Sequence, residues 1–268
     1  AKKNLDGRAV RGVLYFIRLH TDVPESGIKV SEQNAAGAAR VVPAEPAGDK
    51  KKVRKKSTKS EVKNLVGKGE IDSLVELCLN DKKTLRLMQR LLYDPLESYR
   101  MHVAWVIGQV CARVSSREPG QVSELLHRLF EACSDSAATP WGMIETIGCV
   151  IYMRSDIFGA FARHLLNYLK APSTCPQVLW SLAEIAGSRP DLIRDMPFYT
   201  LFGFLQHSDS QVRGNTVRLL ARIKATEAAV QLMGLSSDTA EFCFYSEGKP
   251  AISTVAAEAS TAIQAIRE

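Results

Sequence analysis

The feature that most constrains the fold of this chain is a short pattern that returns at nearly constant spacing. Residues 180–187 read Trp-Ser-Leu-Ala-Glu-Ile-Ala-Gly, and related stretches of eight residues begin at Trp105, Trp141 and Arg218. The three stretches that begin with Trp have Glu or Gln four residues later, and Gly or Ala after three more. The four starts lie 36, 39 and 38 residues apart. A period of this size is typical of helical repeat architectures, in which similar units stack side by side.

Apolar residues at helical spacing run through the chain from about residue 60 onward. Prolines at 95, 119 and 190 begin new segments, because proline fits the first turn of a helix but not its interior. Each unit therefore reads as an outer helix, a short turn and a second helix with the recurring pattern. Short connections make consecutive helices antiparallel neighbours. We predict an all-α, right-handed α-solenoid of about five helix pairs over residues 60–268.

The last unit departs from this pattern. Residues 241–245 read Glu-Phe-Cys-Phe-Tyr, which favours an extended strand, and 246–249 have the composition of a turn before a second short run. We expect a small β-hairpin near 241–254, followed by a closing helix over 255–266. Terminal units of solenoids are often irregular because they cover an apolar edge that has no further repeat beside it.

Residues 211–227 resemble the consensus of HEAT repeats, especially the short bacterial kind first noted in phycobilisome lyases. Val212-Arg213, Leu220-Ala221, Ile223 and Glu227 match that consensus, and Gly108 and Ala183 hold its small position in other units. The stretches that begin with Trp depart from it, so the chain resembles a divergent, armadillo-like member of this group. The resemblance implies the solenoid fold and a binding role, and it brings no catalytic residue with it.

The N-terminal region, residues 1–59, has a different composition and is predicted to be a flexible basic arm. Residues 1–60 have 14 Lys or Arg and 6 Asp or Glu, whereas residues 61–268 have 21 and 23. The six cations between residues 50 and 56 are consistent with a solvated hinge or with a contact for an anion. If all six paired with duplex phosphates, log K would fall with log salt at a slope of about −5. They are Lys50, Lys51, Lys52, Arg54, Lys55 and Lys56.

The composition also excludes several kinds of site. The six cysteines form no Cys-x-x-Cys pair, so we expect buried free thiols in a reducing cytoplasm and neither a disulfide framework nor a zinc site. None of the five histidines is followed by Glu, which excludes the paired His-Glu ligands of di-iron helical-repeat hydroxylases. The longest N-terminal apolar run is too short to span a bilayer. We expect no metal, no cofactor and no membrane partner.

One polar stripe recurs on the second helix of each unit. On a helical wheel, Gln109, Glu145, Glu184 and Arg222 fall on the flank opposite the apolar arc. We call the surface that they share the ladder face, and we predict that it lines the concave side and binds a partner. The alternative is an internal polar ladder, with Glu184 paired to Arg222 and the tryptophans packed as spacers between repeats. The candidate partner-binding residues are Trp105, Gln109, Trp141, Glu145, Trp180, Glu184 and Arg222.

The sequence therefore favours a non-catalytic protein-interaction module or assembly scaffold, whose partner is another protein. The first alternative is a HEAT-type lyase or another cofactor-handling enzyme, for which Glu145, Glu184 and Cys149 are the available reactive groups. The second is a nucleic-acid adaptor that uses the basic arm. A helical-repeat DNA glycosylase is disfavoured, because the repeat region has no excess of basic residues.

Overall fold

The structure is a computed structural model, and it describes residues 57–134 and 141–267. Nearly all of the predicted basic arm, including all six cations between residues 50 and 56, lies outside these residues. Within them, no helix combines the length and the apolar character needed to cross a bilayer.

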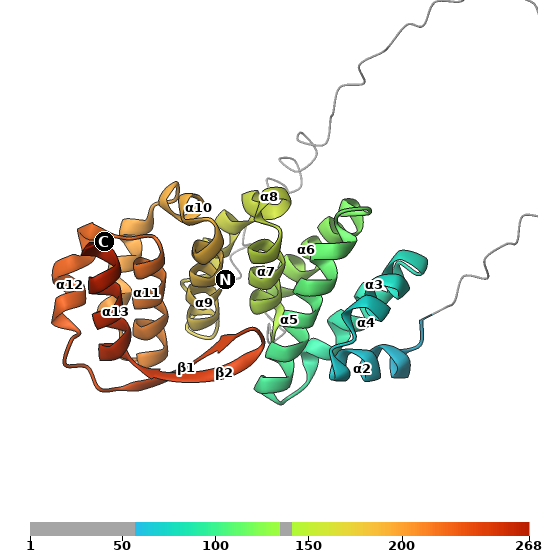
Figure 1. Ribbon diagram of the computed structural model, residues 1–268, viewed down its shortest axis with the longest axis horizontal. Coiled ribbons are helices and arrows are strands. Elements are labelled where there is room, and N and C mark those ends of the chain that lie inside the picture. Colours follow the sequence, from blue (N-terminus) through green and yellow to red (C-terminus); the bar gives the residue numbers. More distant parts are fainter. Residues whose placement is uncertain (1–56, 135–140, 268) are drawn as a thin grey trace, which may run out of the picture. The chain divides into compact units, whose positions relative to one another are not determined.

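Two layers of helices make up the repeat unit, and consecutive members of the inner layer contact one another along the chain (Figure 1). The inner layer holds the ladder positions. Its helices are α3 Ile71–Asn80, α5 Glu97–Val114, α7 Met143–Met153, α9 Cys175–Ser188, α11 Ser210–Arg222 and α13 Val255–Arg267.

The outer layer precedes each inner helix and is wound less regularly. Only α6 is one long α-helix, whereas several other members pass into 3₁₀ segments. The elements are α2 Lys59–Lys68, α4 Lys83–Gln89 with η1 Arg90–Tyr93, α6 Pro119–Ser134, α8 Ser155–Phe158 with η2 Gly159–Tyr168, α10 Pro190–Arg194 with η3 Phe198–Gln206, and η4 Thr226–Ala228 with α12 Ala229–Gly234. From α2 to α13 the described chain forms six outer–inner pairs, one more than expected, and the predicted all-α repeat fold is confirmed.

Local sequence signals explain where several helices begin and end. Gly69 ends α2 in the left-handed region at φ 69°, where a side chain would be strained. Asp209 begins α11, and its carboxylate accepts a hydrogen bond from the backbone N–H of Gln211.

The predicted hairpin is present as β1 Glu241–Ser246 and β2 Lys249–Thr254. The strands are antiparallel and pair Ser246 with Lys249 next to the turn. Glu247 and Gly248 both have positive φ, at 51° and 74°, which is the signature of the type I′ turn that matches the twist of a two-residue hairpin.

Small residues of the recurring pattern bring neighbouring inner helices close together. A methyl group built on Gly148 of α7 would lie 2.5 Å from Ser181 Oγ of α9, and one on Gly108 of α5 would lie 2.9 Å from Cys149 Cβ of α7. The small positions of the pattern at 108 and 148 are therefore required by packing between repeats.

Candidate functional site

The hairpin lies on the inner helices, so the candidate site is a composite of the two. Figure 1 shows the hairpin running from α13 past α11 and α9 toward α5. Phe242 packs against Gly214 of α11, where a methyl group would lie 2.4 Å from its ring. At the other end, the turn residue Gly248 lies against Trp105 of α5, whose Cβ is 3.0 Å from a methyl group built on that glycine. A single extended segment thus reaches from the fifth of the six pairs back to the second.

Side chains of the solenoid bind the outer backbone edge of β1 at alternate residues. Ser210 Oγ donates to the carbonyl of Glu241 over 2.8 Å, and Trp180 Nε1 donates to the carbonyl of Tyr245 over 3.0 Å. Between them, the amide of Gln211 accepts from the N–H of Cys243 over 3.1 Å and donates to its carbonyl. The alternation follows from the register, which turns the backbone groups of these three residues away from β2.

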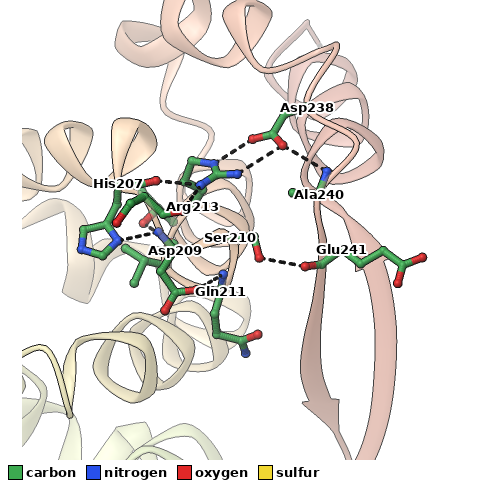
Figure 2. Close-up of polar contacts among 11 residues, drawn as sticks. His207, Asp209, Ser210, Gln211, Arg213, Asp238, Ala240 and Glu241 are labelled. Atoms are coloured by element: carbon green, nitrogen blue, oxygen red, sulfur yellow. Dashed lines mark hydrogen bonds and ion pairs between the residues drawn. The ribbon is translucent and has the colours of Figure 1, made fainter.

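The start of α11 also holds the chain that leads into the hairpin (Figure 2). Arg213 forms an ion pair with Asp238, with Nε 2.7 Å from Oδ2, and its NH1 donates to the carbonyls of His207 and Ser208. The other carboxylate oxygen of Asp238 accepts from the N–H of Ala240 over 3.1 Å. These contacts position β1 along α11.

A charged cluster lies beneath the middle of the hairpin. Glu184 Oε1 is 3.0 Å from a guanidinium nitrogen of Arg218 and 2.9 Å from one of Arg222. Arg218 is only 6% exposed, and its guanidinium carbon lies 3.8 Å from the centre of the Phe244 ring. Burial, reinforced by the nearby Arg222, lowers the pKa of Arg218. The pairing of Glu184 with Arg222 that the alternative, an internal polar ladder, leads one to expect is present. Arg218 joins it from the position that Trp occupies in the other units.

Glu145 shares the ladder position with Glu184 but has no such partners. It is 9% exposed, and its Oε2 makes no hydrogen bond within residues 57–134 and 141–267. Burial raises the pKa of this carboxyl to about 7, against a smaller opposing effect of its own backbone N–H and of Arg100. Ladder positions are therefore not equivalent. Glu184 belongs to a neutralised cluster, whereas Glu145 is a buried acid that forms no ion pair with any described residue.

The three tryptophans of the pattern occupy three different environments. Trp180 is 7% exposed and bonded to the hairpin, and Trp105 is partly buried against the hairpin turn. Trp141 is 40% exposed, with the guanidinium carbon of Arg100 5.1 Å from its ring centre. Gln109 is half-buried on α5. Of the predicted partner-binding residues, Trp105 and Trp180 lie under the hairpin. Glu184 and Arg222 meet in one charged cluster. Trp141 and Glu145 take part in neither group of contacts.

Sequence reasoning missed the residues that hold the hairpin: Ser210, Gln211, Arg213 and Arg218. The signal for Arg218 was available, since a cation replaces the aromatic residue at the start of the fourth stretch. Ser210 and Gln211 look like ordinary first-turn helix residues, and only the position of β1 gives them a role.

Of the three groups considered for enzymatic chemistry, Glu145 and Cys149 are buried and Glu184 is tied up in the cluster with Arg218 and Arg222. Burial raises the pKa of the Cys149 thiol well above its usual range, and the carboxylates of Glu184 and Glu145 add to the effect. A thiol in this state is a poor nucleophile, because only the thiolate reacts. In the part of the chain that the structure covers, no group of three His, Cys, Asp or Glu side chains is placed to hold a metal ion. All six cysteines are free thiols.

Comparisons with known proteins identify the fold. No protein-family model and no curated protein matches this chain. A solved structure of an engineered protein aligns with a TM-score of 0.53 at 14% identity, over 78% of this chain and 90% of that one. A designed armadillo repeat protein in complex with the peptide (KR)4 aligns with a TM-score of 0.48 at 17% identity, over 82% and 95% of the two chains. The likeness is one of fold alone, and the chain has the fold of a helical repeat protein.

Proposed function

We propose that this chain is a non-catalytic protein-interaction module, an assembly or scaffold factor, that binds an extended segment of a partner protein on the ladder face. The observation that carries the proposal is the way in which this face already holds β1. Three side chains from two inner helices bind its backbone at alternate residues. In recognition of this kind, hydrogen bonds to the backbone give affinity for an extended strand, and contacts with its alternate side chains give specificity.

Because β1 already lies on the ladder face, a partner segment would add to the open edge of β2, the other strand of the same hairpin. The register turns the backbone groups of Pro250, Ile252 and Thr254 away from β1. Outside the hairpin, the N–H of Ile252 donates no hydrogen bond to any described residue and its carbonyl accepts none, and its side chain is 72% exposed. Pro250 contributes only its carbonyl. An added strand would form hydrogen bonds with the backbone of Ile252 and with the carbonyl of Pro250. Such a short docking edge suits a reversible complex.

A photo-crosslinking amino acid at Ile252 tests the location of the partner. The matched control is Val230 of α12 in the outer layer, which is 74% exposed. We expect adducts from position 252 to map to one recurring segment of a partner protein, and few adducts from position 230. Equal labelling from both positions, or adducts scattered without a recurring segment, would contradict the proposal.

Backbone-directed variants test the mode of binding once that segment is known. Ile252→Pro removes the outward N–H at an edge position that tolerates proline, whereas Ile252→Thr keeps it and remains β-branched. We expect Ile252→Pro to weaken binding of the synthetic segment, measured by fluorescence anisotropy, and Ile252→Thr to bind nearly as well as the wild type. The six free thiols support a reducing compartment such as the cytoplasm as the place where this occurs.

A further inference from the structure

A second surface, away from the hairpin, has the features of an anion site. A groove of about 390 Å³ lies between α4–η1 and α6 in the outer layer. Three arginines from these two segments converge on it, together with a tyrosine and a single carboxylate. The lining residues are Arg86, Gln89, Arg90, Tyr93, Arg128, Glu131 and Ala132.

Arg86 and Arg90 lie one helical turn apart, and both are exposed. Neither forms an ion pair with any residue that the structure describes. Like charges at this spacing destabilise a helix slightly, so helix stability does not account for the arrangement. Two unpaired guanidinium groups on one wall of a groove are instead suited to an anionic ligand.

Arg128 projects from the opposite wall and is held in position. Its Nε donates to Gln89 Oε1 over 3.3 Å, and its NH1 donates to Glu124 Oε1 over 2.7 Å. Its side chain is only 24% exposed. The contact with Gln89 connects the two walls, so the third guanidinium is positioned before any ligand arrives, which lowers the entropic cost of binding.

The size and charge of the groove favour a phosphomonoester. Arg86 and Arg90 are unpaired among the described residues, whereas Arg128 pairs with Glu124, and the lining has one carboxylate, so a ligand with one to two negative charges matches this balance. Guanidinium groups match phosphate oxygens in a two-pronged geometry. The volume lies at the lower end of the range for small-ligand sites, and Tyr93 adds a half-exposed ring as an apolar wall.

We propose that this groove binds a phosphomonoester group, held by Arg86, Arg90 and Arg128. The group belongs either to a phosphorylated side chain of a protein or to a small phosphorylated molecule. This site is independent of the hairpin and of the function proposed for the ladder face.

Titration calorimetry of the full chain tests the proposal with three probes at constant ionic strength: phenyl phosphate, a short phosphoserine peptide and a 12-base-pair DNA duplex. The double variant Arg86→Gln/Arg90→Gln removes two donors from one wall. The control Arg117→Gln/Arg267→Gln makes the same change in net charge at two exposed positions outside the groove. The basic arm is identical in all three proteins, so its contribution cancels.

We expect saturable binding of phenyl phosphate or the phosphopeptide to the wild type and the control. Binding to the groove variant should be weaker by roughly tenfold or more, because two charge-assisted contacts are lost. Preference between the two phosphorylated probes identifies the source of the group. The proposal is overturned if neither probe binds the wild type, if the control loses as much affinity as the groove variant, or if only the duplex binds. A thermal melt establishes that both variants are folded.

Discussion

The units that begin at Trp141 and Trp180 have the same pattern, but their Trp and Glu side chains lie in opposite environments. In the unit at Trp180, the tryptophan is covered by the hairpin and Glu184 neutralises two arginines of α11. In the unit at Trp141, the tryptophan is exposed and Glu145 is a buried acid with an unbonded oxygen. The difference comes from the neighbours along the ladder. Glu184 faces Arg222, whereas Glu145 lies between Gln109 and Glu184 and receives no cation from them. The same local pattern thus acquires a different role in each repeat, according to the repeat beside it.

Replacement of the two tryptophans by alanine should give the largest difference in the free energy of unfolding. Trp180→Ala is expected to destabilise the fold by about 3–5 kcal/mol, because it removes a buried ring and its bond to Tyr245. Trp141→Ala should cost less than about 1 kcal/mol, since its ring is largely solvent-accessible. Urea denaturation of both variants measures the difference. Similar losses would show that the two units are equivalent after all.

Replacement of the two ladder carboxylates by Gln should change the stability of the protein at pH 8 in opposite directions. Glu184→Gln leaves Arg218 nearly buried without its counter-ion, for which we expect a loss of about 3 kcal/mol at pH 8. Glu118→Gln, at an exposed position before α6, serves as a control for the loss of one negative charge. If both variants lost the same small amount, the cluster beneath the hairpin would have no special role in stability.

Glu145→Gln should instead stabilise the protein at pH 8. Burial raises the pKa of this carboxyl to about 7 from its ordinary value near 4.5, so the folded state binds the proton more tightly than the unfolded state. Stability from this group is complete below about pH 4.5 and is lost as pH rises to about 7. The gain in the variant should be on the order of 2 kcal/mol at pH 8 and vanish below pH 4.5. Denaturation midpoints of both proteins between pH 4 and 8 check the sign, and a constant difference across this range would refute it.

The last pair of substitutions replaces Gly148 and Gly187, the glycines that end the two patterns, by alanine, and compares their effects on stability. Gly148→Ala places a methyl group 2.5 Å from Ser181 Oγ and 3.1 Å from its Cα, so we expect a loss of about 1–3 kcal/mol from overpacking. Around Gly187 the nearest atom would be 3.5 Å away, in the flexible side chain of Arg222. Gly187→Ala should therefore be neutral or stabilise by up to about 1 kcal/mol through helix propensity. Thermal melts of the pair decide the point, and equal melting temperatures would argue against close packing at 148.

Much of the fold could be predicted because the controlling signals are local. The helix over Glu97–Val114, the hairpin and its turn, and the cap at Asp209 each depend on residues within a few positions of one another. The repeat period then gives the pairing of neighbours, including the contact between Glu184 and Arg222. The 3₁₀ winding of η2 and η3 was not foreseen, since helical spacing of apolar residues does not separate the two kinds of helix over so short a length.

The candidate site was predicted only in part. The sequence singled out the ladder face but could not show that the hairpin lies on it. That arrangement depends on contacts such as Trp180 with Tyr245, which are 65 residues apart. It also could not rank three similar tryptophans, because their exposure depends on what covers each of them.

By itself, the sequence determined that this protein is a stack of paired helices closed by a hairpin, since periodicity, caps and turn residues act over short distances. The tertiary structure alone decided that the hairpin lies against the inner helices, that one ladder acid is neutralised while its twin is not, and that three arginines meet in an outer groove. These outcomes depend on packing and charge between segments far apart in the chain, where no local pattern reports which side chain will face another.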